Sequence, residues 1–203
     1  MALTTYSGLS TYMERMLNRT DQTAFFPDYL AMAEAHFNRE LRSPSMEASS
    51  TSSTATALVA LPSDCLALRK VTISGTEELV AMSAAQLHMT YTNSNSGDPK
   101  AYAVVGTNLK LAPAPSAATA VDIDYYQRIP ALTSTNTSNW LLTAHPDLYV
   151  WAIRYYAAEE ARDDELASRS LGNVVAILDS ISKSDVARRA PAGPMAARPH
   201  VFE

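Results

Sequence analysis

Apolar residues recur with a helical period at the start of the chain. Two segments, residues 4–18 and 26–42, carry apolar side chains three or four positions apart, and a polar turn separates them. Pro27 suits the first turn of the second segment, and Arg39 and Arg42 suit the negative end of a helix dipole. The pattern predicts two helices paired as an antiparallel hairpin.

The helical period returns near the end of the chain, over residues 146–162 and 164–182. The apolar positions of the first segment are Leu148, Trp151, Ala152, Tyr155 and Tyr156. Those of the second are Leu166, Val174, Leu178 and Ile181, broadened by Ala167, Leu171 and Val175. We therefore expect a second pair of helices.

Between the helical regions, apolar and polar residues alternate as they do in strands. The expected strands are 58–61, 66–73, 79–80, 102–105, 109–111 and 121–126, with a short helix over 83–91 capped by Ser83. Gly106-Thr107-Asn108 is a strong hairpin signal. The Ser/Thr/Ala-rich stretch 48–57 fits either a flexible linker or a Thr-rich edge strand.

This order of elements predicts an α+β fold. The N- and C-terminal helices form a helical bundle around a central antiparallel β-rich insertion, and an extended tail follows. The expected divisions are 1–42 for the N-terminal hairpin, 43–140 for the insertion with its short helix, 141–182 for the C-terminal helical pair, and 183–203 for an extended or disordered tail.

Composition narrows the possible functions. Charged residues make up only 18% of the 203 residues, which suits a surface largely buried against partners and equally suits a plain Ala-rich globular protein. The formal net charge of -5 argues against a chain held to nucleic acid by phosphate neutralisation. The single cysteine, Cys65, excludes an intrachain disulfide and is expected to be a buried, inert thiol. We expect neither a signal peptide nor a membrane span, and hence a cytoplasmic protein before assembly.

Charge is distributed unevenly near the C-terminus. Residues 141–182 hold seven acids and three bases, whereas residues 183–203 hold four bases and two acids. The basic tail could contact DNA phosphates or lie as an extended peptide across an acidic neighbour, and its prolines and apolar end favour the peptide. The predicted partner-binding residues are Lys183, Arg188, Arg189, Arg198, Val201 and Phe202.

The search for chemistry finds no phosphate loop, dinucleotide fingerprint or nucleophile elbow. His36 with Glu40 fits a surface pair better than half of a metal site. The acids in 159–165 lack the spacing of a calcium loop and suit an exposed face, with Asp164 and Glu165 in the first turn of the last helix. We therefore predict no catalytic, cofactor-binding or metal-binding residue, and not an enzyme.

Six short motifs, in order, carry a resemblance over about residues 4–182. They are Asn38-Arg39-Glu40-Leu41-Arg42, Leu61-Pro62-Ser63-Asp64, Leu109-Lys110-Leu111-Ala112-Pro113, Tyr125-Tyr126 with Ile129-Pro130-Ala131-Leu132, Asn139-Trp140-Leu141-Leu142, and His145-Pro146-Asp147-Leu148-Tyr149. In this order they resemble the head-to-tail adaptor family of tailed bacteriophages.

The resemblance implies a homo-oligomeric ring, commonly a dodecamer, docked under the portal protein in the virion after assembly in the host cytoplasm. Such a ring extends the DNA channel, lets DNA pass without specific binding, and offers a platform to tail or nozzle proteins. No cofactor and no membrane are implied. By our interpretation Trp140, Pro146, Trp151 and Tyr155 form the core and hinge where the insertion returns to the helices.

Two alternatives remain open. A tail-completion or stopper protein would close the channel with a loop, for which 93–99 and 131–139 are the candidates. A monomeric ligand-binding or regulatory domain, from a different class, would instead have a closed apolar pocket.

Overall fold

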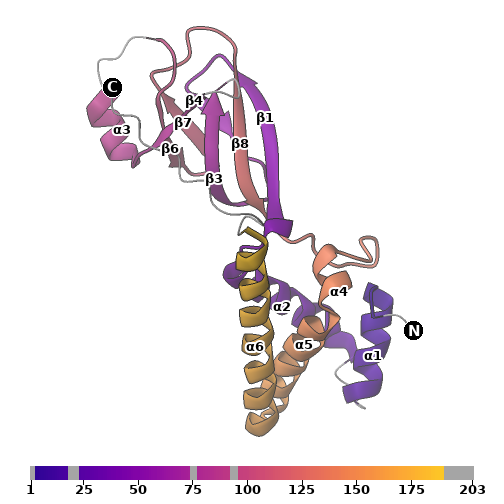
Figure 1. Cartoon of the computed structure of the whole chain (residues 1–203). Coiled ribbons are helices and arrows are strands. Elements are labelled where there is room, and N and C mark those ends of the chain that lie inside the picture. Colours follow the sequence, from indigo (N-terminus) through magenta and orange to yellow (C-terminus); the bar gives the residue numbers. More distant parts are fainter. Residues whose placement is uncertain (1–2, 18–22, 74–76, 92–95, 190–203) are drawn as a thin grey trace. The chain divides into compact units, whose positions relative to one another are not determined.

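The computed structural model describes residues 3–17, 23–73, 77–91 and 96–189. They fall into two compact units, one within Met1–Ser45 and Ile129–Glu203 and the other within Met46–Arg128 (Figure 1). The first is helical and the second contains the sheets, so the predicted α+β class is confirmed. The sheets end by Gln127, and residues 129–140, expected in the insertion, fall in the helical unit.

The helical unit contains five α-helices in its described residues. They are α1 (Tyr6–Leu17), α2 (Phe26–Glu40), α4 (Trp140–Ala144), α5 (Pro146–Ala161) and α6 (Asp164–Arg189), with a short 3-10 turn, η1 (Thr23–Phe25), before α2. Pro27 and Pro146 stand in the first turns of α2 and α5, where a missing backbone N–H costs no helical hydrogen bond.

Helix α5 is the centre of this unit, because it contacts α1, α2, α4 and α6. Its buried residues include the consecutive run Leu148, Tyr149 and Val150, which at 100° per residue cannot lie on one face. The single stripe predicted for this helix is therefore wrong. Helices α1 and α2 both pack on α5, and they also meet each other through the rings of Tyr6 and Phe26, whose centroids are 5.4 Å apart. Their pairing as an antiparallel hairpin stays a prediction.

Helix α6 is longer than predicted and includes Lys183 and Arg188, which the sequence had assigned to an extended tail. Its buried positions, Ala167, Ser170, Val174, Leu178, Ile181 and Asp185, follow one helical stripe past residue 182. No Gly or Pro follows residue 182 until Pro191, which explains why helical backbone continues to Arg189, the last described residue.

The second unit contains two four-stranded sheets and one helix in its described residues. Sheet A has the order β1 (Glu47–Thr54), β8 (Thr119–Gln127), β3 (Cys65–Ile73), β4 (Glu77–Glu78). Sheet B has the order β2 (Leu58–Ala60), β7 (Asn108–Ala112), β6 (Ala101–Val105), β5 (Val80–Ala81). All pairings are antiparallel except that of β5 with β6, which is parallel.

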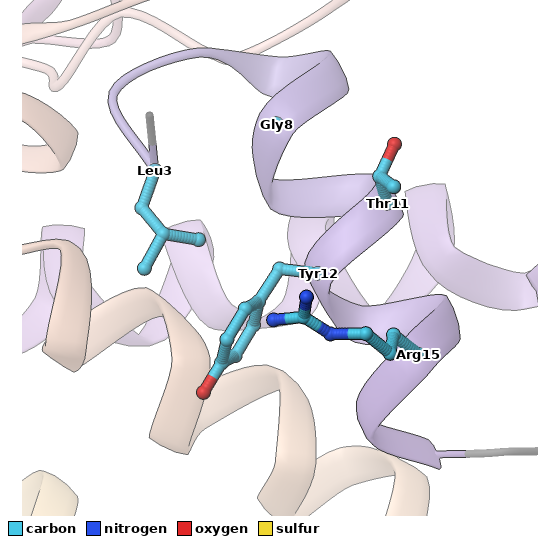
Figure 2. Close-up of a pocket in the computed structure, with 5 residues that line it drawn as sticks. All are labelled: Leu3, Gly8, Thr11, Tyr12 and Arg15. Carbon is cyan, nitrogen blue, oxygen red and sulfur yellow. The ribbon is translucent and has the colours of Figure 1, made fainter. Parts of the chain in front are cut away.

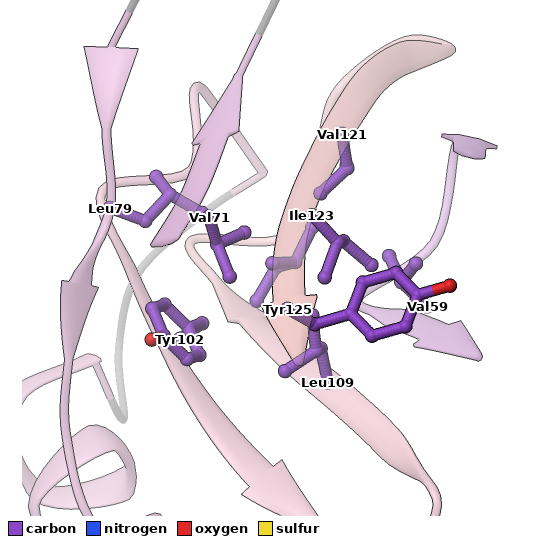
Figure 3. Close-up of a cluster of buried hydrophobic side chains, with 9 residues drawn as sticks. Val59, Val71, Leu79, Tyr102, Leu109, Val121, Ile123 and Tyr125 are labelled. Carbon is purple, nitrogen blue, oxygen red and sulfur yellow. The ribbon is translucent and has the colours of Figure 1, made fainter. Parts of the chain in front are cut away.

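The inner faces of the two sheets share one buried cluster (Figure 3). Val71, Ile123 and Tyr125 enter it from sheet A, and Tyr102 and Leu109 enter it from sheet B. The other face of sheet B is covered by α3 (Ala84–Tyr91), whose Leu87 packs with alanines of β6 and β7. This unit is therefore a sandwich with one helix on its outside.

Several local predictions are confirmed here. Gly106 takes φ 62° at the first position of the β6–β7 turn, a conformation that suits glycine. Ser83 Oγ accepts a hydrogen bond from Gln86 N–H at 3.2 Å, as a helix cap does. Of the two interpretations of 48–57, the edge strand is confirmed, because β1 pairs along its whole length with β8. A further 3-10 turn, η2 (Pro44–Met46), precedes β1.

Candidate interaction surfaces

A buried polar network fixes the segment between sheet A and α4. Glu34 is only 7% exposed, and its Oε1 accepts a hydrogen bond from Leu132 N–H at 2.9 Å. Asn38, one turn further along α2, accepts from Ile129 N–H at 2.9 Å through Oδ1. Two polar side chains of α2 thus hold the returning chain by its backbone.

The other end of this segment is held by Asn139, which is also buried. Its Oδ1 accepts from Leu142 N–H at 2.8 Å, which caps α4, and its Nδ2 donates to the carbonyl of Pro130 and to Tyr149 Oη, both at 2.8 Å. Tyr149 Oη in turn donates to Glu34 Oε1 at 3.5 Å. One network therefore joins α2, residues 129–139, α4 and α5.

Burial dominates the electrostatics of this network. It raises the pKa of Glu34 from 4.5 to about 7, although the Leu132 N–H and the Tyr149 hydroxyl act in the opposite direction. Burial also raises the pKa of Tyr149 above its usual range. Glu34 therefore changes its charge near neutral pH.

The four side chains of the network are Glu34, Asn38, Asn139 and Tyr149. The sequence analysis placed the last three in motifs of the resemblance, but it assigned a buried polar contact to none of the four. A signal for Glu34 was present, because Leu30, Ala33, Glu34 and Phe37 follow one helical stripe in which Glu34 is the only charge. A carboxylate on the apolar side of a helix needs a buried partner. The partners lie about 100 residues further along the chain, so the sequence pattern could not identify them.

Beside this network lies a groove of about 370 Å³. Its walls come from α1, α2 and the returning segment, and we call it the Glu34 groove; it is lined by Tyr6, Pro27, Leu30, Ala31, Glu34 and residues 131–134. Glu34 is the one charged residue in this lining. The groove thus presents largely apolar walls, the hydroxyl groups of Thr133 and Ser134, and a single acid.

Two further grooves run along α6. One of about 420 Å³, which we call the α2–α6 groove, is lined by His36, Glu40, Leu171, Val175, Leu178, Asp179 and Ser182. The other, of about 350 Å³, lies between α6 and the start of α5, where His145 and Asp147 contribute. Val175 is 56% exposed and Val186 is 68% exposed, so α6 shows apolar side chains on the flank of its buried stripe, about 100° around the helix.

A small pocket under α1 is unsuitable for a cofactor (Figure 2). Its volume is about 70 Å³, whereas ligand pockets of drug size reach roughly 300–1,000 Å³. The Arg15 guanidinium lies 5.5 Å from the centre of the Tyr12 ring. This cation–π contact gives the two polar side chains of the pocket a structural role.

The four predicted core and hinge residues are half-buried rather than in the core. Trp140 begins α4 and Pro146 begins α5, while Trp151 and Tyr155 lie on α5 beside its most buried positions. Arg154 stacks over the Trp151 ring at 5.3 Å. The fully buried side chains are their neighbours Leu141, Leu142, Leu148 and Tyr149. A hinge role for the four residues remains a prediction.

The predicted partner-binding residues do not form one extended tail. Lys183 is exposed on α6 and pairs with Asp179 at 2.5 Å, one helical turn away. Arg188 is exposed near the end of the described part of α6, and Arg189 is the last residue of that part. Arg198, Val201 and Phe202 lie outside the described residues.

The acids of residues 159–165 are exposed, as predicted. Asp163 Oδ1 accepts from Leu166 N–H at 3.0 Å at the start of α6, and Asp164 and Glu165 lie in its first turn. Tyr29 donates a hydrogen bond to Glu160, which joins α2 to the end of α5. These contacts give most of the cluster a structural role.

Other candidates for chemistry were also followed into the structure. Cys65 is half-buried, whereas the sequence predicted a buried thiol. Its partial burial raises the pKa of the thiol, and the negative charge of Asp64 raises it further, so the reactive thiolate is disfavoured. Among the described residues, no group of three or more His, Cys, Asp or Glu side chains could hold a metal ion. No helix within the described ranges is long and apolar enough to cross a bilayer.

The described residues thus offer grooves and exposed helix faces for protein contacts, which is typical of an interaction protein. The sequence profile of the SU10 adaptor protein family matches residues 4–198. The chain therefore belongs to this family of phage head-to-tail adaptors, which is a structural family and not a class of enzymes. The match extends past residue 182, where our resemblance ended. No curated protein matches the chain.

Proposed function

We propose that this chain forms a homo-oligomeric ring under the portal protein, extends the DNA channel, and provides the docking platform for tail or nozzle proteins. The observation that carries the proposal is the match of nearly the whole chain to a head-to-tail adaptor family. That family role supports a place in the virion and contacts with portal and tail proteins.

Two features support contacts between copies in such a ring. The α2–α6 groove and the exposed Val175 and Val186 lie on the outside of the helical unit, and apolar side chains of this kind favour burial against a partner. The low overall charge of the chain reduces the desolvation that assembly requires. We propose a dodecamer, from the family resemblance.

The net charge supports passage of DNA without binding. A chain with 21 acids and 16 bases repels phosphates on average, so DNA can slide along it. The bases at the end of α6 and in residues 190–203 then serve a protein partner, either the portal or a neighbouring subunit.

The test is native mass spectrometry of the full chain alone and mixed with its portal protein. Rings should form on the portal, and a chain ending at Arg189 should bind it more weakly. The truncation belongs there rather than at Lys183, because removing residues 183–189 would shorten α6 itself. A chain that stays monomeric with the portal present would contradict the ring.

The stopper alternative requires a loop that enters the channel. Residues 131–139 are a poor candidate, because Glu34 and Asn139 hold their two ends and Asn136 Nδ2 donates to the carbonyl of Ala131 at 2.7 Å. Part of 93–99 lies outside the described residues. Density for an open channel bordered by neither loop would count against a stopper.

A further inference from the structure

We propose that the Glu34 groove binds the guanidinium of Arg198 from the C-terminal segment of a neighbouring copy. The inference rests on the proposed ring, which places a second copy of the chain beside each subunit. It assigns a binding site for a cationic side chain to a part of the helical unit that also fixes the chain returning from the sheets.

The acid in the groove has an oxygen available. Glu34 Oε1 accepts both hydrogen bonds of the carboxyl group, from Leu132 N–H at 2.9 Å and from Tyr149 Oη at 3.5 Å. Among the described residues, Oε2 has no hydrogen bond, and Glu34 lines the groove. A carboxylate has about four acceptor positions, so Oε2 can accept from a guanidinium while Oε1 keeps its partners.

The walls suit an arginine rather than a compact cation. Tyr6, Pro27, Leu30 and Leu132 provide apolar surface for the three methylene groups of the side chain. No base lines the groove, and the other groups that titrate near Glu34 are the hydroxyls of Tyr6 and Tyr149. A docked guanidinium would therefore meet one charge, of opposite sign, in a place largely removed from water.

The extent of α6 indicates which basic side chain could occupy the Glu34 groove. Three of the four bases assigned to the tail lie in the helix, so Arg198 is the one Lys or Arg in residues 190–203. This segment can extend about 46 Å at roughly 3.3 Å per residue, and three prolines reduce the entropy lost on docking. Val201 and Phe202, just after Arg198, can add apolar contact.

In a closed ring, the number of C-terminal segments equals the number of Glu34 grooves. Each copy provides one C-terminal segment and one Glu34 groove, so in a closed ring every groove is filled by the segment of a neighbour. If Glu34 only held the Leu132 N–H, a glutamine at position 34 would serve as well, because its carbonyl accepts the same bond. This difference separates a binding role from a purely structural one.

The first experiment measures binding of a labelled peptide of residues 190–203 by fluorescence polarisation. The receiver is the full chain with Arg198→Gln, whose own segment lacks the arginine. We expect Glu34→Gln in this receiver to weaken binding at least about fivefold, and Glu14→Gln, an exposed Glu→Gln control on α1, to leave it unchanged.

A variant of the peptide provides a second comparison, which does not depend on how the receiver variants fold. A peptide with Arg198→Gln should bind at least about fivefold more weakly than the native peptide. Equal binding of the two peptides, equal binding to the receivers with and without Glu34→Gln, or no binding of the native peptide would each overturn the assignment.

The pH dependence gives an independent reading. Glu34 must be ionised to pair with the guanidinium, so binding should weaken from pH 8 to pH 6 as the carboxyl group takes up a proton. His200 of the peptide gains charge over the same range and works in the opposite direction. Loss of the weakening in the receiver that carries Glu34→Gln supports the site, and its persistence there contradicts it.

Cross-linking on the portal tests whether the partner is a neighbour. In a chain with Cys65→Ser, cysteines replace Ser134 in the groove and Ala197 beside Arg198. Oxidation should give a ladder of linked subunits, whereas linkage within single chains would overturn docking on a neighbour. Rings without groove-dependent peptide binding would refute this inference alone. Groove-dependent peptide binding without rings would refute the proposed function and the docking on a neighbour, and it would leave only the guanidinium site in the Glu34 groove.

Discussion

Glu34 occupies a position in α2 where the sequence pattern predicts an apolar side chain. Its carboxyl group holds Leu132 by the backbone and contacts Tyr149, so the residue connects parts of the chain about 100 positions apart. The arrangement carries an electrostatic cost, because burial disfavours the charged form. That cost can be measured through the dependence of stability on pH.

For Glu34→Gln we expect a change in this pH dependence. The folded pKa of about 7 lies above the ordinary 4.5, so the folded state holds the proton more tightly. The contribution of Glu34 to the free energy of unfolding is therefore fully present below pH 4.5 and lost as the pH rises through 7. Urea unfolding should show the wild type losing about 1–2 kcal/mol relative to Glu34→Gln between pH 5 and 8.

The control for this prediction is Glu14→Gln, which removes an exposed carboxyl group on α1. It should follow the wild-type pH profile. Parallel profiles for the wild type and Glu34→Gln would show that Glu34 has the same pKa in the folded and unfolded states, contrary to its burial.

Ser170 gives a second prediction for a single residue. It is fully buried on α6, and its Oγ has no hydrogen-bond partner among the described residues. Since an unpaired buried hydroxyl is destabilising, Ser170→Ala should raise the free energy of unfolding by about 1 kcal/mol. Ser168→Ala, exposed on the same helix, should leave it unchanged, and a loss of stability in Ser170→Ala would reveal a hidden partner.

At the scale of elements, the buried stripe of α6 extends further along the chain than the apolar pattern from which the helix was predicted. The buried positions continue through Ile181 to Asp185, and a charged residue in the last position hides the stripe from a search for apolar residues. The helix therefore incorporates three bases that composition alone assigned to a disordered segment.

Ile181→Ala tests whether the end of α6 is part of the packed unit. Ile181 is 3% exposed, so shortening it should lower the free energy of unfolding by about 2–4 kcal/mol in urea denaturation. Val186→Ala is the matched control, because its side chain is exposed and its removal should cost little. If both variants unfold like the wild type, the last turns of α6 do not pack as described.

The sequence predicts elements well where one local pattern decides them. The helical period located α2 and α5, and the Gly106 turn located the β6–β7 hairpin. Sequence patterns did not predict features that depend on contacts between distant parts of the chain. Examples are the packing of α1 and α2 on α5 and the buried network around Glu34. Helix α4 was missed because its five residues are too few to show a period, although Asn139 provides its cap.

At the scale of the whole molecule, the family assigns a role that depends on neighbours. The described residues provide grooves along helices, exposed valines on α6, and a single acid in the largely apolar Glu34 groove. These features suit contacts between proteins better than chemistry on a small molecule. The proposed ring predicts that a change on the outer face of α6 will affect assembly without affecting the fold.

Val175→Glu is the change that tests this expectation. Val175 is exposed and lines the α2–α6 groove together with Glu40 and Asp179, so a third acid there should repel a neighbouring subunit and remove apolar contact. We expect about tenfold less ring on the portal in native mass spectrometry, which corresponds to about 1.4 kcal/mol for the ring as a whole, summed over all its contacts. The melting temperature of the free chain should not change, because the side chain is not buried there.

The matched control is Ser168→Glu, which adds the same charge to an exposed position of α6 that does not line the α2–α6 groove. Because both variants change the net charge equally, a general effect of charge on portal binding would reduce ring formation in both. A loss confined to Val175→Glu would place the subunit contact at the α2–α6 groove. Rings formed equally by Val175→Glu and the wild type would exclude that groove and require the contact to lie on another face of the chain.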